Sequence, residues 1–158
     1  MPMPLSRSIA LPLAGLLLAA TTGCSSFERS WRAAASIPSS AHSLAGRWEG
    51  SWRSDVNGHQ GRLRCLITPQ TGDVFEARFH ATYLKVLRFG YTVPLTARFT
   101  NDAWHFHGEA DLGKMAGGVF HYAGTATSQR FHSTYRSRSD HGTFEMQRPA
   151  SILPPRKP

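Results

Sequence analysis

The feature that most constrains the fold is a repeated alternation of apolar and polar residues between Leu44 and Pro149. Alternation with a period of two residues is typical of strands that bury one face, whereas the apolar face of a helix repeats every 3.6 residues. One parity carries aromatic and small residues, and the other carries most of the charges. The alternating segments are residues 48–52, 63–67, 75–83, 87–95, 97–99, 104–110, 120–126, 131–135 and 144–146.

Short turn sequences, such as Asn57-Gly58, Asn101-Asp102 and Gly117-Gly118, separate these segments. Turns of this length join antiparallel strands, because a parallel crossover needs a dozen or more residues, which no connection here supplies. The aromatic parity has to be buried, so the sheet must close on itself or fold over. We therefore predict an all-β domain over residues 44–149. We expect a small antiparallel up-and-down barrel of eight or nine strands, in preference to a β-sandwich.

The N-terminus has the composition of a signal peptide. Arg7 is followed by an uncharged run over residues 9–20, which is shorter than the ~20 apolar residues that a membrane-spanning helix needs. We assign residues 1–23 to the signal peptide. Residues 24–43 are rich in Ser and Ala and are predicted to form a flexible tether, with the composition for a turn or two of helix before Pro38. Residues 150–158 are expected to form a loose Pro-rich tail.

The segment over residues 18–25 resembles the cleavage box of bacterial lipoproteins. In that family a small residue precedes a cysteine that is acylated and becomes the mature N-terminus. Gly23 and Cys24 match this pattern, while Thr21 stands where the family usually has Leu. The resemblance implies lipidation of Cys24 and anchoring of an exported protein in the bacterial envelope. Ser25 implies sorting to the outer membrane, on its periplasmic side. An ordinary secretory peptide that contains a cysteine is the alternative.

Gly46-Arg47-Trp48, which opens the first predicted strand, resembles the Gly-x-Trp signature of calycins, the superfamily of lipocalins, fatty-acid-binding proteins and avidins. The resemblance implies a barrel that binds a small, mostly apolar ligand in its mouth. No later lipocalin motif and no avidin ligand set matches, so the ligand stays open.

Ligand-lining residues are expected where small and aromatic residues share the inward parity. At Gly108 and Gly124 the missing side chain leaves either ligand volume or room for a neighbouring ring. The candidates are Trp52, Tyr83, Tyr91, Phe106, Gly108, Tyr122 and Gly124.

The chain has 18 Lys and Arg against 10 Asp and Glu, a formal net charge of +8. Most of the arginines in the alternating region fall on the outward parity. Such a face attracts anions, including lipid headgroups and other anionic components of the envelope, although a solvated barrel exterior is the simpler explanation. Nucleic acid is not expected as a partner of an exported, tethered protein. The outward arginines are Arg47, Arg53, Arg62, Arg64, Arg78, Arg88, Arg98 and Arg136.

Groupings that carry chemistry are weak. His105, His107 and Glu109 share one face of a predicted strand and are suitable zinc or copper ligands, but that face is the outward one, where solvated polar residues belong. We regard them as weak metal candidates and predict no metal site. No Gly-x-Ser-x-Gly motif with a supporting base is present, so we predict no catalytic residue and no cofactor. Cys65 lies in an alternating segment and is expected to be buried.

The leading hypothesis is therefore a noncatalytic, lipid-anchored barrel that binds a small apolar ligand or an envelope component. Its rival is a structural or interaction lipoprotein with a solid barrel and an anion-attracting exterior, and a metal-dependent enzyme is a third class. The barrel interior discriminates the first two, because a cavity well below ~300 Å³ is too small for a typical ligand site.

Overall fold

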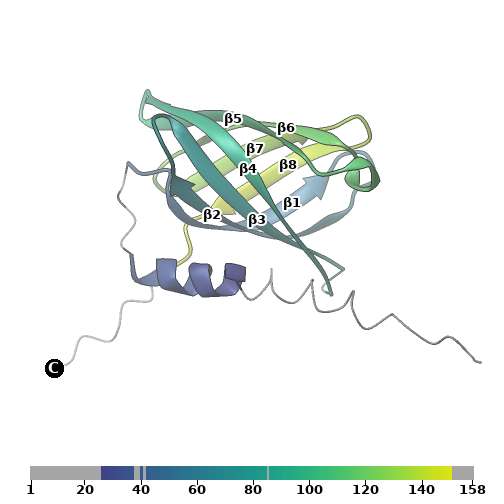
Figure 1. Cartoon of the computed structure of the whole chain (residues 1–158), viewed down its shortest axis with the longest axis horizontal. Coiled ribbons are helices and arrows are strands. Elements are labelled where there is room, and N and C mark those ends of the chain that lie inside the picture. The colour runs from purple at the N-terminus through teal and green to yellow at the C-terminus, as the bar shows by residue number, and fades with distance from the viewer. Residues whose placement is uncertain (1–25, 38–39, 41, 85, 151–158) are drawn as a thin grey trace, which may run out of the picture.

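The computed structural model describes residues 26–37, 40, 42–84 and 86–150 (Figure 1). It begins with an α-helical segment over residues 26–33, which continues into the 3-10 helix η1 (Ala34–Ser36). A second 3-10 helix, η2 (Lys114–Ala116), lies between two strands. The strands are β1 (Gly46–Ser54), β2 (Gln60–Pro69), β3 (Val74–Tyr83), β4 (Leu87–Thr100), β5 (Ala103–Asp111), β6 (Val119–Ala126), β7 (Arg130–Arg136) and β8 (His141–Gln147).

The eight strands form one closed barrel in chain order, and every neighbouring pair is antiparallel. β1 pairs with β2 on one side and with β8 on the other, which closes the sheet. The predicted antiparallel up-and-down barrel is thus confirmed. It has eight strands rather than nine because the segments at 87–95 and 97–99 are one continuous strand, in which Val93, Leu95 and Ala97 all point inward.

The inward parity forms a single core inside the barrel. Trp48 is completely buried, and Phe106 and Phe131 stack with ring centroids 4.7 Å apart. Cys65 is buried, as expected, and burial raises the pKa of its thiol well above the usual value, so it stays protonated and unreactive. Inward-parity residues that are nevertheless exposed include Leu87, Phe89 and Phe99, near the ends of β4.

The tight turns form where the sequence supplies residues that tolerate a left-handed backbone. Asn101 and Asp102 have φ values of 52° and 59° between β4 and β5. Two successive left-handed residues make the turn that matches the twist of a β-hairpin, and Asn and Asp adopt this conformation more readily than most residues. The turn chemistry therefore sets the register of this hairpin, with Thr100 opposite Ala103.

Residues 26–36, which the sequence places in a flexible tether, instead form a helical segment that packs on the outer wall of the barrel. Phe27 and Trp31 are buried against Leu66, an apolar residue at an outward position of β2. The guanidinium groups of Arg47 and Arg64 lie over the Trp31 ring, at 5.4 Å and 5.2 Å from its centroid. Burial of the two aromatic rings and these cation–π contacts favour the docked helix.

Among the described residues no helix is long and apolar enough to cross a membrane. The predicted signal peptide, with Cys24 beyond its end, and nearly all of the predicted tail lie outside the described residues.

Candidate functional site

The two ends of the barrel differ, and one of them is closed by Trp48. Its indole nitrogen donates a hydrogen bond to the carbonyl oxygen of Leu44 at 3.0 Å, and both residues are fully buried. Arg148, just after β8, places its guanidinium carbon 3.7 Å from the centroid of the Trp48 ring. The same guanidinium donates hydrogen bonds to the carbonyl oxygens of Ser43, Ala45 and Arg47. Arg148 therefore ties the end of β8 to the start of β1 across the Trp48 ring.

This closure requires a partly buried charge. Burial lowers the pKa of Arg148 to about 10, so the side chain is still protonated at neutral pH. A buried guanidinium is tolerated only when most of its donors are satisfied. Three backbone carbonyls meet this need, although Nε of Arg148 has no partner within the described chain.

The opposite end of the barrel contains a cavity of about 320 Å³. This volume is at the lower end of the range for small-molecule sites, roughly 300–1,000 Å³. Its walls are mainly aromatic and aliphatic, and its described lining contains no Lys or Arg. The lining residues are Trp52, Leu63, Ala81, Phe89, Tyr91, Leu112, Ala116, Phe120, Tyr122, Tyr135, Asp140 and Phe144.

Tyr91 and Tyr122 bring hydroxyl groups into this apolar cavity. Their rings stack at 6.3 Å between centroids, and each phenol affects the pKa of the other. Burial raises the pKa of both phenols above the usual value. Both groups therefore stay neutral at physiological pH and present hydrogen-bonding dipoles rather than charges.

A second polar group in the lining is Asp140, in the β7–β8 turn. Its Oδ1 accepts a 2.6 Å hydrogen bond from the hydroxyl of Ser54, and its Oδ2 lies 3.3 Å from the hydroxyl of Tyr135. Burial, followed by the nearby Asp140 charge, raises the pKa of Tyr135. The carboxylate thus holds neighbouring strands together and gives the cavity a negative rather than a positive polar group.

Of the seven sequence-predicted lining residues, Trp52, Tyr91 and Tyr122 line the cavity. Tyr83 lies beside them, with its ring centroid 6.0 Å from that of Trp52. Phe106 belongs to the packed core instead, stacked on Phe131.

The two predicted glycines lie where the barrel is filled. A Cβ on Gly124 would come within 2.7 Å of Phe106 Cζ, so the neighbouring ring occupies the space that the glycine leaves. A Cβ on Gly108 would come within 2.3 Å of the Pro94 carbonyl oxygen and 2.9 Å of Leu95 Cδ2. At Gly124 these contacts match the neighbouring ring, one of the two explanations that the sequence left open. At Gly108 backbone and aliphatic side chains take up the space, which neither explanation named.

Sequence reasoning did not select several residues that line the cavity. Phe120, Tyr135 and Phe144 all have the inward parity, so parity alone could have included them. Asp140 and Leu112 lie in connections, where no periodic pattern exists to indicate an inward side chain. Their position depends on how the loops at this end fold over the barrel.

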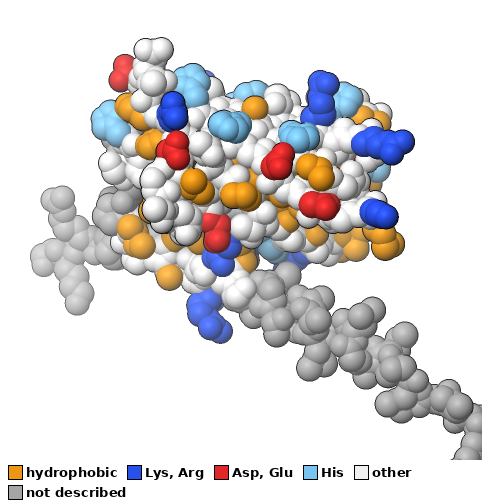
Figure 2. Space-filling view, turned by 45° about the horizontal axis from the view of Figure 1, so that its top comes forward, with side chains coloured by type: hydrophobic (Ala, Val, Ile, Leu, Met, Phe, Trp, Pro, Cys, Tyr) orange, Lys and Arg blue, Asp and Glu red, His pale blue; other side chains and the backbone are white. Residues whose placement is uncertain are grey.

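The weak metal candidates lie apart from the cavity. His105, His107 and Glu109 are exposed on the outer face of β5, and Glu109 pairs with His121 of β6 at 3.4 Å. Within the described residues, no three His, Cys, Asp or Glu side chains are grouped so that they could hold a metal ion. Figure 2 shows histidines and charges of both signs scattered over the face that includes the top of Figure 1.

No protein-family model matches the sequence, and no curated protein matches it significantly. Among solved structures, the chain is similar to a β-barrel reported under the description "De novo design of a fluorescence-activating beta barrel". The match has a TM-score of 0.50 and 18% sequence identity, and covers 72% of this chain and all of the designed chain. This likeness supports the fold, an eight-stranded antiparallel barrel.

Proposed function

We propose that this protein is an exported, lipid-anchored barrel that binds a small, mostly apolar molecule and has no catalytic role. The observation that carries the proposal is the cavity of about 320 Å³ at one end of the barrel. Its volume favours ligand binding over the alternative of a solid barrel, because it reaches the lower limit for small-molecule sites.

The chemistry of the lining favours an uncharged ligand. The walls are apolar, the hydroxyls of Tyr91 and Tyr122 are neutral, and the charged group is the Asp140 carboxylate. An anionic ligand would lose its hydration without meeting a cation. A neutral ligand with one hydrogen-bonding group fits the two phenols. The designed barrel of similar fold is described as fluorescence-activating, which is consistent with a small-molecule role for this architecture.

Binding is tested with N-phenyl-1-naphthylamine, a neutral apolar dye whose fluorescence rises in an apolar site. We expect the wild-type protein to bind the dye. Ala81→Leu, which adds three carbons to the cavity wall, should weaken binding. Ala123→Leu makes the same change on the exposed outer face of β6 and serves as the matched control. A correctly folded wild-type protein that does not bind the dye at high concentration would rule out the ligand-binding proposal.

Anchoring through Cys24 is supported by the resemblance of the segment around it to a lipoprotein cleavage box. It is tested by native mass spectrometry of the detergent-extracted protein, which reports covalent lipid, bound ligand and bound metal together. We expect added lipid mass on the wild type, and an uncleaved precursor without lipid for Cys24→Ala. Recovery of normally processed, membrane-free wild-type protein would contradict the anchor and leave the binding result unaffected.

A further inference from the structure

A second hollow of the molecule lies outside the barrel. It is a surface groove of about 940 Å³ over β2, β3 and β4, bordered by the docked helical segment. In contrast to the interior cavity, most of its lining residues are of polar or charged types, and three of them are arginines. The lining residues are Glu28, Ser51, Gln60, Gly61, Arg62, Arg64, His80, Thr82, Leu84 and Arg88.

Strand register places two arginines of this groove in one row. Arg62 of β2 lies opposite Thr82 of β3, and Thr82 lies opposite Arg88 of β4. Arg62 and Arg88 are therefore two strand spacings apart, about 10 Å between their backbones. Two guanidinium groups at this spacing can reach the same phosphate or two adjacent ones.

These two arginines differ from Arg64 in the next row. Arg64 is paired with Glu28 and lies over the Phe27 ring at 5.3 Å, so helix docking already uses it. Arg62 and Arg88 are exposed, and within the described part of the chain neither forms an ion pair. Their charge is therefore available to a partner.

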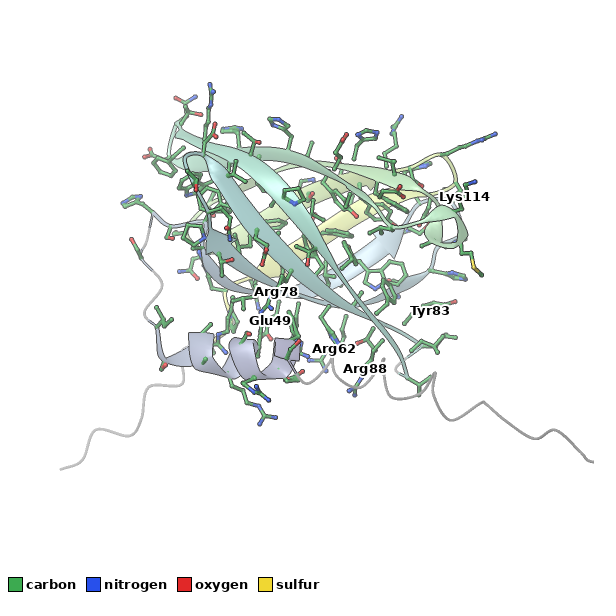
Figure 3. All side chains as sticks on the ribbon, in the orientation of Figure 1. Glu49, Arg62, Arg78, Tyr83, Arg88 and Lys114 are labelled. Carbon is green, nitrogen blue, oxygen red and sulfur yellow. The ribbon has the colours of Figure 1, made fainter. Side chains whose placement is uncertain are left out.

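The β3–β4 hairpin next to this row has an apolar tip. The exposed fractions of Leu84, Val86 and Leu87 are 65%, 75% and 56%. Figure 3 shows the hairpin extending downward beyond the barrel wall, with Arg62 and Arg88 labelled on the same underside. An exposed apolar tip beside cations matches the structure of a lipid interface, which has hydrocarbon below a layer of phosphates.

The described chain also begins at this face. Residue 26 starts the helical segment, and Glu28 borders the groove. Cys24 is two residues before the first described residue. A lipid attached there would bring the bilayer to this side of the barrel.

We propose that the face formed by Arg62, Arg88 and the hairpin tip docks on an anionic lipid bilayer. The side chains of Leu84, Val86 and Leu87 enter the acyl boundary, and the two guanidinium groups bind lipid phosphates. The proposal deepens the proposed membrane anchoring and rests on it for proximity to a bilayer, but it does not depend on the chemistry of the anchor.

The test places an environment-sensitive fluorophore on Val86→Cys in the chain without the predicted signal peptide (residues 24–158) carrying Cys24→Ser, so that only this site and the buried Cys65 are thiols. The matched label is on Met115→Cys in η2, a fully exposed site outside the proposed face. The protein is mixed with vesicles of phosphatidylcholine alone or with a third phosphatidylglycerol. We expect the label at position 86 to be shielded from aqueous quenchers on anionic vesicles, and the label at 115 to stay accessible.

The arginine contribution is tested by Arg62→Ser with Arg88→Ser in the same labelled chain. Each basic residue near an anionic surface contributes about fivefold to binding, so removing the pair should lower the docked-to-undocked ratio about 25-fold. Arg130→Ser with Arg136→Ser removes the same charge from exposed positions of β7 and should have a much smaller effect.

Any one of three outcomes would overturn the proposal. A label at position 86 that stays accessible on anionic vesicles would exclude docking through the hairpin. Equal shielding on neutral vesicles, or equal loss in both arginine pairs, would exclude specific headgroup recognition by this face. The lipid mass on wild-type Cys24 is measured separately, so failure of the anchor and failure of this docking face are distinguishable.

Discussion

Gly124 provides a direct test of how tightly the barrel interior is packed. Gly124→Ala adds a single Cβ, which would lie 2.2 Å from the carbonyl oxygen of His132 and 2.7 Å from Cζ of Phe106. Both distances are well inside van der Waals contact. Because the first neighbour is backbone, its clash is relieved only if β6 and β7 separate locally. Relief of the second clash requires the Phe106 ring to shift in its stack with Phe131.

The expected cost follows from two opposing effects. Overpacking a filled core typically costs about 1–3 kcal/mol. Replacing Gly by Ala also restricts the unfolded chain, which stabilises a protein by about 0.4–1 kcal/mol when the native backbone accepts the residue. The net destabilisation should be about 1–2 kcal/mol. For a domain of this size, Tm should fall by about 4–8 °C for each kcal/mol.

Gly90→Ala is the matched control, since Gly90 is also a glycine inside a strand. A Cβ there would lie 3.4 Å from the carbonyl oxygen of Phe79 and 3.9 Å from Cδ2 of His80, both ordinary contacts. The unfolded-state effect should therefore dominate, with a change between zero and about 1 kcal/mol of stabilisation. Urea unfolding of the wild type and both variants, fitted to a two-state transition, measures the differences. If Gly124→Ala is as stable as the wild type, or if Gly90→Ala loses as much as Gly124→Ala, the packed-ring explanation is incorrect.

Two further predictions concern the ends of the chain. Arg148→Ala removes the cation over Trp48 and the hydrogen bonds that tie β8 to the start of β1, so it should lower the free energy of unfolding by about 2–4 kcal/mol. Arg148→Lys should recover only part of this loss. A loss below about 0.5 kcal/mol for Arg148→Ala in urea unfolding would contradict this role. Helix docking should weaken in acid. Burial, reinforced by Arg64, lowers the pKa of His80 below its usual 6.5, and the hydrogen bond from Arg64 lowers the pKa of Glu28 below 4.5. At a pH above the usual pKa of each group, both shifts stabilise the docked state. The His80 contribution is lost as the pH falls from 6.5 through the lowered pKa of His80. Amide exchange over residues 27–33, corrected for the intrinsic rate, should rise across this range in the wild type, whereas His80→Gln should lack that step.

The fold could be predicted because its signals are local. Each strand shows its inward face through a period of two residues, and pairs such as Asn101-Asp102 indicate the turns. This alternation also distinguishes inward residues such as Trp48, which is completely buried, from outward residues such as Arg62, which is exposed. Whether 87–99 holds one strand or two was open in the sequence. It was resolved by pairing with β3 and β5, which is a long-range property.

The site was only partly predictable, because parity gives the face of a strand and not the level along the barrel axis. Tyr122 and Gly124 share a parity, yet the first lines the cavity and the second lies against Phe106. Their levels depend on the stagger between neighbouring strands, which no single segment records. The docked helix had one local signal, the apolar Leu66 among outward arginines, but its partners Phe27 and Trp31 lie in a segment without a sustained pattern.

The pairing of β1 with β8 has a consequence for the order of folding. Trp52 pairs with Phe144, about 90 residues later, so closing the barrel brings together the most distant parts of the domain and carries a large loop-closure entropy. Until His141–Gln147 has been synthesised, β1 and β7 each have an unpaired edge, and the inward aromatic residues are not enclosed. Arg148 comes just after this last strand, so the contact with Trp48 forms only once the chain is almost complete. A nascent chain of this protein therefore cannot close its barrel until its synthesis is almost complete.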